Sequence, residues 1–292
     1  MAGFRNIRDL GLALTDSGKT WISTFRKVPA ATATIAGQWF DYGYAAGNPI
    51  PNYYAASPLV AATLEADKGI IVPRMAAGST QWLHRFSLMS AGATSSTQPF
   101  YLNDYLMYYP FVDMDAAGED QVMDNTVTLP RYSDGVGVQM MVVAQSGTVG
   151  GGRFAITYTG SDDVQYVTQS LFCGAAQPSG AIVSAAGAVG GLLPFVPLNA
   201  GVKGVKRVDS VNFTVANGGL CCVVLVKPLD VSQTLESCSV AGIGSAVEKE
   251  ALRLRGGIVE IKDGAFLAFM GRGVAGSVAS APLVGTVETV WS

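Results

Sequence analysis

The sequence predicts a mainly β protein with a β-sandwich or jelly-roll-like body and an extended, partly helical N-terminal arm. From residue 126 onward, short apolar runs with strand-like alternation follow one another, and turns rich in glycine separate them. The first hundred residues mix one helical pattern with irregular stretches rich in proline, glycine and aromatic residues. We therefore expect residues 1–100 to form the arm and residues 101–292 to form the β-sandwich body.

The arm is expected to begin with a helix followed by a strand. The helix is predicted by the spacing of four apolar residues, Phe4, Ile7, Leu10 and Leu14. The pair Ser17-Gly18 ends it, and the apolar run from Trp21 to Val28 predicts a strand.

Residues 37–54 contain prolines and glycines that prevent regular structure, together with six aromatic side chains. These aromatic residues are Trp39, Phe40, Tyr42, Tyr44, Tyr53 and Tyr54. Because large aromatic surfaces are costly to leave in water, the segment should lie against a protein surface. The sequence leaves open whether that surface belongs to this chain or to a neighbouring subunit.

A second helix is expected before the β-rich region. Leu102, Tyr105, Leu106 and Tyr109 have the spacing of one helical face, and Pro110 would end the helix.

The body is expected to consist of short strands. We predict strands at 137–145, 154–158, 164–168, 211–215, 220–226, 258–262, 265–270 and 283–291. The turn at 159–163 makes a hairpin, residues 217–219 make another turn, and Lys227-Pro228 ends the strand before it. Residues 174–201, rich in alanine, glycine and serine, are expected to form a long surface or interface loop.

The composition excludes several classes of protein. Charged residues make up 14% of the chain, against roughly 25% in an average soluble protein. This low content of charged residues excludes a coiled coil and a highly charged disordered protein. With 19 basic and 22 acidic residues the net charge is −3, so a large nucleic-acid-binding surface is not expected. Hydrophobic residues make up 49% of the chain, and the mean hydropathy is +0.31. We interpret this as apolar surface covered by other chains.

Neither a membrane span nor a signal peptide is expected. No charge occurs between Asp163 and Lys203, but prolines, glutamines and glycines interrupt this stretch. The first apolar stretch carries Arg5, Arg8 and Asp9, which a signal peptide would not.

The four cysteines, Cys173, Cys221, Cys222 and Cys238, form no C-x-x-C pair, and we expect them to be reduced and buried.

Two motifs resemble nucleotide-binding loops but lack the required context. Residues 271–276 match G-x-G-x-x-G, yet no helix pattern follows and no acidic residue stands about 20 positions on. Residues 17–20 resemble the end of a P-loop, but the helix precedes the motif and the strand follows it. Both are expected to be ordinary loops, and no cofactor is expected.

Two further patterns could carry chemistry. Asp113, Asp115 and Gly118 match part of a calcium loop, but Ala117 and Asp124 do not, and a solvated acidic turn is the preferred interpretation. His84 is the only histidine, and no G-x-S-x-G sequence presents a nucleophile, so we expect a structural role for it and no enzymatic activity.

Several stretches carry a resemblance to a known group of proteins: residues 37–41, 47–54, 104–114, 124–132, 224–229 and Val290-Trp291. In these stretches the chain resembles tailed-bacteriophage virion proteins encoded among head and structural genes. The resemblance implies a non-enzymatic structural subunit, with a capsid decoration or cement protein as the first choice. The alternative is a neck, turret or tail adsorption component with a carbohydrate-binding β-domain, in which Tyr53 and Tyr54 would contact the sugar.

This reading predicts partners and anchors. The partners would be the major capsid protein or other virion subunits, and further copies of this chain, a trimer being one arrangement. Localisation in the virion after assembly in the host cytoplasm is expected, with no direct contact to nucleic acid or membrane. The residues predicted to anchor the chain are Phe4, Ile7, Leu10, Leu14, Trp21, Trp39 and Phe40.

Overall fold

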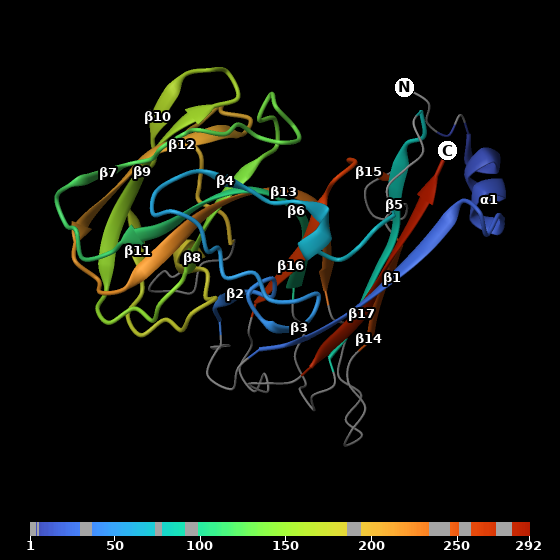
Figure 1. Ribbon diagram of the computed structural model, residues 1–292, viewed down its shortest axis with the longest axis horizontal. Helices are drawn as coiled ribbons and strands as arrows, with labels where there is room; N and C mark the ends of the chain where they lie inside the picture. Colours follow the sequence, from blue (N-terminus) through green and yellow to red (C-terminus); the bar gives the residue numbers. More distant parts are fainter. Residues whose placement is uncertain are drawn as a thin grey trace.

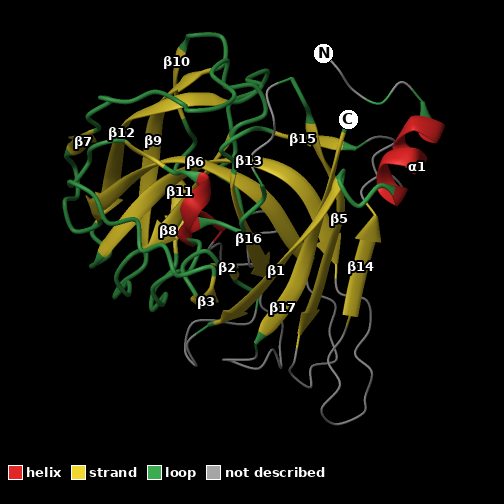
Figure 2. Cartoon of the chain, turned by 45° about the vertical axis from the view of Figure 1, so that its right-hand side comes forward, coloured by secondary structure: helices red, strands yellow, loops and turns green. Residues whose placement is uncertain are grey.

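The fold is built almost entirely from antiparallel strands (Figures 1 and 2). The computed structural model describes residues 4, 6–29, 37–73, 78–90, 99–185, 194–233, 246–250, 258–272 and 282–292. Within these residues the strands form three sheets, which we call the terminal, central and distal sheets. The predicted β class and the short N-terminal helix, α1 (Ile7–Thr15), are confirmed.

The terminal sheet contains the strands nearest to both chain ends. Its order is β14 (Ala246–Glu250), β5 (Gln81–Ser90), β17 (Leu283–Trp291), β1 (Thr20–Val28) and β3 (Ala46–Asn48), and β15 (Val259–Ile261) also pairs with β5. The helix α1 packs on this sheet through Leu10 and Ala13, which contact Val290. Its first turn is capped by Asn6, whose Oδ1 accepts a hydrogen bond from the Asp9 amide at 3.0 Å.

The other two sheets complete the body. The central sheet has the order β2 (Trp39–Asp41), β16 (Phe266–Arg272), β6 (Pro99–Asp113), β13 (Leu220–Gln233) and β8 (Gln139–Ala144), with β4 (Ala62–Thr63) paired to β6. The distal sheet has the order β10 (Gln165–Val167), β9 (Gly152–Gly160), β12 (Val205–Val215) and β7 (Asp120–Val122), with β11 (Leu171–Cys173) paired to β9. Two short 3₁₀ helices, η1 (Ala66–Lys68) and η2 (Val183–Ala185), lie in connecting segments.

The terminal and distal sheets pack against the same face of the central sheet. Phe269 of β16 lies in the core shared with the terminal sheet, and Leu225 of β13 lies in the core shared with the distal sheet. Their chain neighbours Met270 and Val226 point to the opposite face. That face is covered by Tyr54, Leu64 and Ile182 from connecting segments, and Trp39 of β2 packs in the same core. Figure 1 shows the resulting arrangement, with the distal strands on one side and the terminal strands on the other.

The predicted division at residue 100 is not a boundary in the structure. Residues 20–27 of β1 pair with β17 at the other end of the chain, and β2 pairs with residues 270–272 of β16. The first hundred residues thus supply strands to both sheets instead of forming a separate arm. The local pattern predicted the strand β1 correctly, but strand partners more than 200 residues away leave no local trace.

The predicted helix at residues 102–109 is wrong, because this stretch is the middle of the 15-residue strand β6. From Phe100 to Pro110 only Tyr101 is not buried, since the strand lies at the centre of a sheet that is covered on both faces. A strand buried on both faces loses its alternation, and any apolar run then also satisfies helical spacing.

The strand predicted to end at Lys227-Pro228 continues as β13 to Gln233. Pro228 is accommodated where the register with β6 shifts between Pro228 and Asp230, a position that needs no regular ladder hydrogen bond. The hairpin around 159–163 and the strands β8, β9, β15, β16 and β17 match the predictions within a few residues. The expected loop at 174–201 includes η2, and its residues 186–193 lie outside the described part of the chain. No helix among the described residues has the length and apolar character needed to cross a membrane.

Candidate functional site

The predicted anchors on the N-terminal helix differ in their exposure. Ile7 is 76% exposed, whereas Leu10 is 5% exposed and packs against Val290 in the chain's own core. Phe4 and Leu14 are partly buried against the same cluster. Of these four residues, only Ile7 is exposed in the folded chain.

The predicted aromatic anchors also divide into two groups. Trp39 and Phe40 are 1% and 2% exposed and lie inside the body, so they are not available as anchors. The open question about residues 37–54 is thereby answered for their buried aromatic residues, which pack in the cores of their own chain. Trp21 at the start of β1 is 47% exposed, and its Nε1 donates a hydrogen bond to Ser23 Oγ at 3.0 Å.

A groove runs along β1 beside Trp21; we call it the β1-edge groove. It encloses about 270 Å³ and is lined by residues 21–24, 48–49 and 69–71. Ile22 and Ile71 at this groove are 60% and 64% exposed. Ser23 Oγ donates a hydrogen bond to the Ile71 carbonyl and so holds the two walls together. Among the described residues, the strand β3 covers this edge of β1 only at residues 26–28, which leaves residues 20–25 open.

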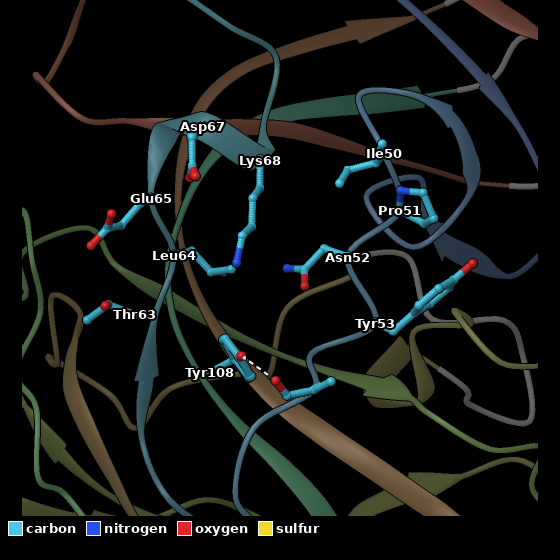
Figure 3. Close-up of a pocket in the computed structure, with 11 residues that line it drawn as sticks. Ile50, Pro51, Asn52, Tyr53, Thr63, Leu64, Glu65, Asp67, Lys68 and Tyr108 are labelled. Carbon is cyan, nitrogen blue, oxygen red and sulfur yellow. Dashed lines mark hydrogen bonds between the residues drawn. The ribbon is translucent and has the colours of Figure 1, made fainter.

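A larger cavity of about 480 Å³ lies between residues 50–55 and residues 63–68 (Figure 3). Its lining residues are Ile50, Pro51, Asn52, Tyr53, Ala55, Thr63, Leu64, Glu65, Asp67, Lys68 and Tyr108. We call it the Asn52–Lys68 cavity, after the two side chains that face each other across it in Figure 3.

One wall of the cavity is held by β4 and η1. Ala62 and Thr63 pair with Tyr108 and Met107 of β6, and the Leu64 amide donates to the Leu106 carbonyl at 2.9 Å. Gly69, which follows η1, lies so close to β16 that an added Cβ would come within 2.9 Å of the Leu267 amide nitrogen. A side chain larger than hydrogen is therefore excluded there, and this wall rests directly on the central sheet.

The other wall is held by a buried polar network. Asp41 Oδ1 accepts hydrogen bonds from the Gly43 amide and the Tyr105 hydroxyl, both at 2.8 Å, and Oδ2 accepts one from the Tyr54 hydroxyl. The buried Lys27 donates to the Pro49 carbonyl at 2.7 Å. These bonds hold the turns on each side of residue 52, so both walls are formed before any ligand arrives.

Burial shifts the pKa values of this network. Desolvation raises the pKa of Asp41, even though the hydrogen bonds from Tyr54 and Tyr105 and the charge of Lys27 oppose the rise. Desolvation lowers the pKa of Lys27 to about 8, and the nearby charge of Asp41 opposes this fall. Both groups lie inside the body, so we assign them a structural role.

Tyr53 and Tyr54 were both expected to contact a sugar, but only Tyr53 is exposed. Tyr53 is 52% exposed at the rim of the cavity, and its ring packs edge-to-face on Tyr44 with centroids 4.9 Å apart. Tyr54 is fully buried at 0% exposure, where it packs on Tyr108. No ligand can reach the Tyr54 ring in the folded chain.

The remaining sequence motifs form no second site among the described residues. Asp113 and Asp115 accept hydrogen bonds from the backbone amides of Asp115 and Gly218, both at 2.9 Å. The part of the chain that the structure describes holds no group of three or more His, Cys, Asp or Glu side chains arranged for a metal ion. His84 Nδ1 lies 3.5 Å from a Glu288 carboxylate oxygen, beside the ion pair between Arg85 and Glu288.

The cysteines and the glycine motif are consistent with packing roles where they are described. Cys173, Cys221 and Cys222 are free and buried, and burial raises the pKa of Cys173 to about 12. Cys238 lies outside the described residues. In the G-x-G-x-x-G stretch, Gly271 and Arg272 belong to β16, and residues 273–276 lie outside the described residues.

Comparison with family models, with curated proteins and with solved structures finds no match to this chain. The groove and the cavity therefore have to be interpreted from their own chemistry. Sequence reasoning missed Asn52 and Lys68 as partners, since no spacing rule joins an irregular loop to a 3₁₀ helix 16 residues away. The one available signal was the dense clustering of aromatic and proline residues at 47–54.

Proposed function

We propose that this chain is a non-enzymatic structural subunit of a tailed-bacteriophage particle, acting as a capsid decoration or cement protein. The observation that carries the proposal is the β1-edge groove, where Trp21, Ile22 and Ile71 expose apolar surface beside an open strand edge. Exposed apolar side chains next to one another are typical of a surface that another chain covers. The low charge content and the resemblance to phage virion proteins support the same conclusion.

An open strand edge suits this role because a second chain can add to it. A partner segment that lies along residues 20–25 would gain main-chain hydrogen bonds, and its apolar side chains would fill the groove. The contact could be modest in affinity, because many copies on a particle act together. Ile7, 76% exposed on the neighbouring helix α1, would extend this contact.

Quantitative gel densitometry of purified particles tests the proposal. A decoration protein is expected at a copy number comparable to that of the coat protein, whereas an adsorption component would be scarce. Absence of the chain from purified particles would overturn the proposal.

Surface variants test the groove itself. Ile22→Lys and Ile71→Lys place a charge at the groove, and each should weaken incorporation into particles by about tenfold or more if the side chain is buried in the contact. Val167→Lys on β10 is the matched control, since Val167 is a similarly exposed strand residue at 56% but belongs to the distal sheet. Equal incorporation of all three variants would show that the groove is not the contact.

A further inference from the structure

We propose that the Asn52–Lys68 cavity binds a neutral oligosaccharide, whose hydroxyl oxygens would be held between the two facing donors Asn52 Nδ2 and Lys68 Nζ. This inference does not depend on the proposed assembly role, because the cavity and the β1-edge groove are lined by different residues. The volume of the cavity, about 480 Å³, lies within the range of roughly 300–1,000 Å³ that small-molecule sites occupy.

The first observation is an unsatisfied donor. Asn52 Oδ1 accepts a hydrogen bond from the Tyr54 amide at 3.1 Å, and this bond fixes which end of the side-chain amide points into the cavity. The Nδ2 group at the other end is buried and has no hydrogen-bond partner among the described residues. Buried donors in native proteins are nearly always paired with protein or water oxygens, so Nδ2 has hydrogen-bonding capacity to offer an oxygen in the cavity.

The second observation is that Lys68 points at the same space. Figure 3 shows the Lys68 side chain extending from η1 toward Asn52, with the ammonium and the amide nitrogen facing each other. The described residues offer the Lys68 ammonium no hydrogen-bond or ion-pair partner. The Lys68 side chain is exposed, so its ammonium is open to water and to a ligand oxygen that enters the cavity beside Asn52.

The charges around the cavity favour a neutral hydroxyl oxygen over the oxygen of an anion. Lys68 contributes one positive charge, and Glu65 and Asp67 contribute two negative charges, which leaves 1 − 2 = −1 at the lining. A net negative lining disfavours phosphate or another free anion. A sugar hydroxyl suits it better, because it accepts from Asn52 and Lys68 and donates to a carboxylate such as that of Asp67, which Figure 3 shows directed toward the cavity.

Aromatic side chains border the same space. Tyr53 lies at the rim with its ring held against Tyr44, and Tyr108 lies on the floor, where its hydroxyl hydrogen-bonds to the Ala55 carbonyl. Apolar faces of pyranose rings pack well against such rings, which are rigid and keep a polar edge for water. Since both walls are held by the body, little ordering would be needed on binding.

Saturation-transfer difference NMR with the full chain tests the proposal. The probes are neutral trisaccharides of glucose, of mannose and of N-acetylglucosamine, with the trisaccharide of galacturonic acid as the acidic comparison. We expect at least one neutral trisaccharide to bind with a Kd below about 1 mM. Failure of every neutral probe to bind at about 10 mM, or a preference for the acidic probe, would overturn the proposal.

Two variants assign the signal to the cavity. Asn52→Asp keeps the acceptor for the Tyr54 amide but removes the Nδ2 donor, and Lys68→Met removes the ammonium but keeps the side-chain stem. Each should weaken binding by about tenfold or more. Lys203→Met, an exposed lysine outside the cavity, is the matched control and should bind like the parent chain. Unchanged thermal unfolding shows that the variants fold, and unchanged binding in both cavity variants would overturn the assignment.

Discussion

Removal of Arg131 is expected to destabilise the fold more than removal of any surface charge. Arg131 Nε and Nη2 donate to the two Asp104 carboxylate oxygens at 2.9 and 2.7 Å, and the Asp104 side chain is 0% exposed. Nη2 also contacts the Leu64 and Tyr105 carbonyls at 3.3 and 3.0 Å. The Phe266 amide donates to Asp104 at 3.0 Å, so this pair joins β6, β16 and a wall of the Asn52–Lys68 cavity.

The magnitude follows from what Arg131→Met leaves behind. Methionine fills part of the volume, but Asp104 then remains buried without its cation, which costs about 3–5 kcal/mol in measured cases. The double variant Asp104→Asn with Arg131→Met should recover a large part of this loss, because a neutral amide carries a much smaller desolvation cost. Arg207→Met is the surface control, because Arg207 is 54% exposed in its pair with Asp209. It should lose less than about 1 kcal/mol.

The pH dependence gives a second signature. Burial raises the pKa of Asp104 from 3.8 to about 6, although Arg131 opposes the rise. The native state therefore holds this proton more tightly than the unfolded chain, and Asp104 costs stability as the pH rises from about 4 through 6. Without Arg131 the pKa rises further, so the extra loss in Arg131→Met should be largest above pH 7. It should shrink as the pH falls to about 5, where the carboxyl is increasingly protonated.

Urea unfolding followed by tryptophan fluorescence measures these differences, with the buried Trp39 among the reporters. The parent chain, the two single arginine variants and the double variant would be compared at pH 5 and pH 7.5. A loss below about 1 kcal/mol for Arg131→Met at pH 7.5, or a loss of equal size at both pH values, would refute this reasoning.

Two further changes probe packing and buried charge. Gly285→Ala should destabilise the fold by about 1–3 kcal/mol or more, because the new Cβ would lie 2.2 Å from the Ser87 carbonyl oxygen. Gly11→Ala in α1 meets no atom within 4 Å and should instead stabilise it by about 0.5–1 kcal/mol; thermal unfolding that ranks the two the other way would contradict the packing. Burial lowers the pKa of Lys27 to about 8 from 10.5, so its cost to stability should disappear as the pH rises from about 8 to 10. Lys27→Met should therefore lack this rise in unfolding free energy relative to the parent, and parallel pH profiles of the two chains would refute it.

The sequence was sufficient to predict the elements whose pattern depends only on residues close together in the chain. Helical spacing from Phe4 to Leu14 predicted α1, and alternation at residues 154–158 with turn residues after it predicted the β9–β10 hairpin. One face of each of these elements is exposed, so burial and exposure alternate along the chain with the period of the element. The mainly β class follows from the same alternation repeated many times.

The candidate sites were only partly visible in the sequence. Trp21 and Tyr53 were among the aromatic residues singled out, and both are exposed where a partner or ligand could reach them. Trp39, Phe40 and Tyr54 are aromatic residues of the same irregular segment as Tyr53, but they are buried. Chemical type alone does not separate the two groups, because an irregular segment has no periodicity that tells which side faces the core.

The sequence by itself determined a sheet-rich chain with one short helix and many glycine turns, because these depend on neighbours within a few residues. Tertiary structure alone decided that β1 pairs with β17, that β6 is a strand buried on both faces, and that Asn52 faces Lys68. Strand pairing and burial on two faces depend on which distant segments meet. The alternation of side chains along a strand shows which side chains share a face, but it does not show which strand lies beside it.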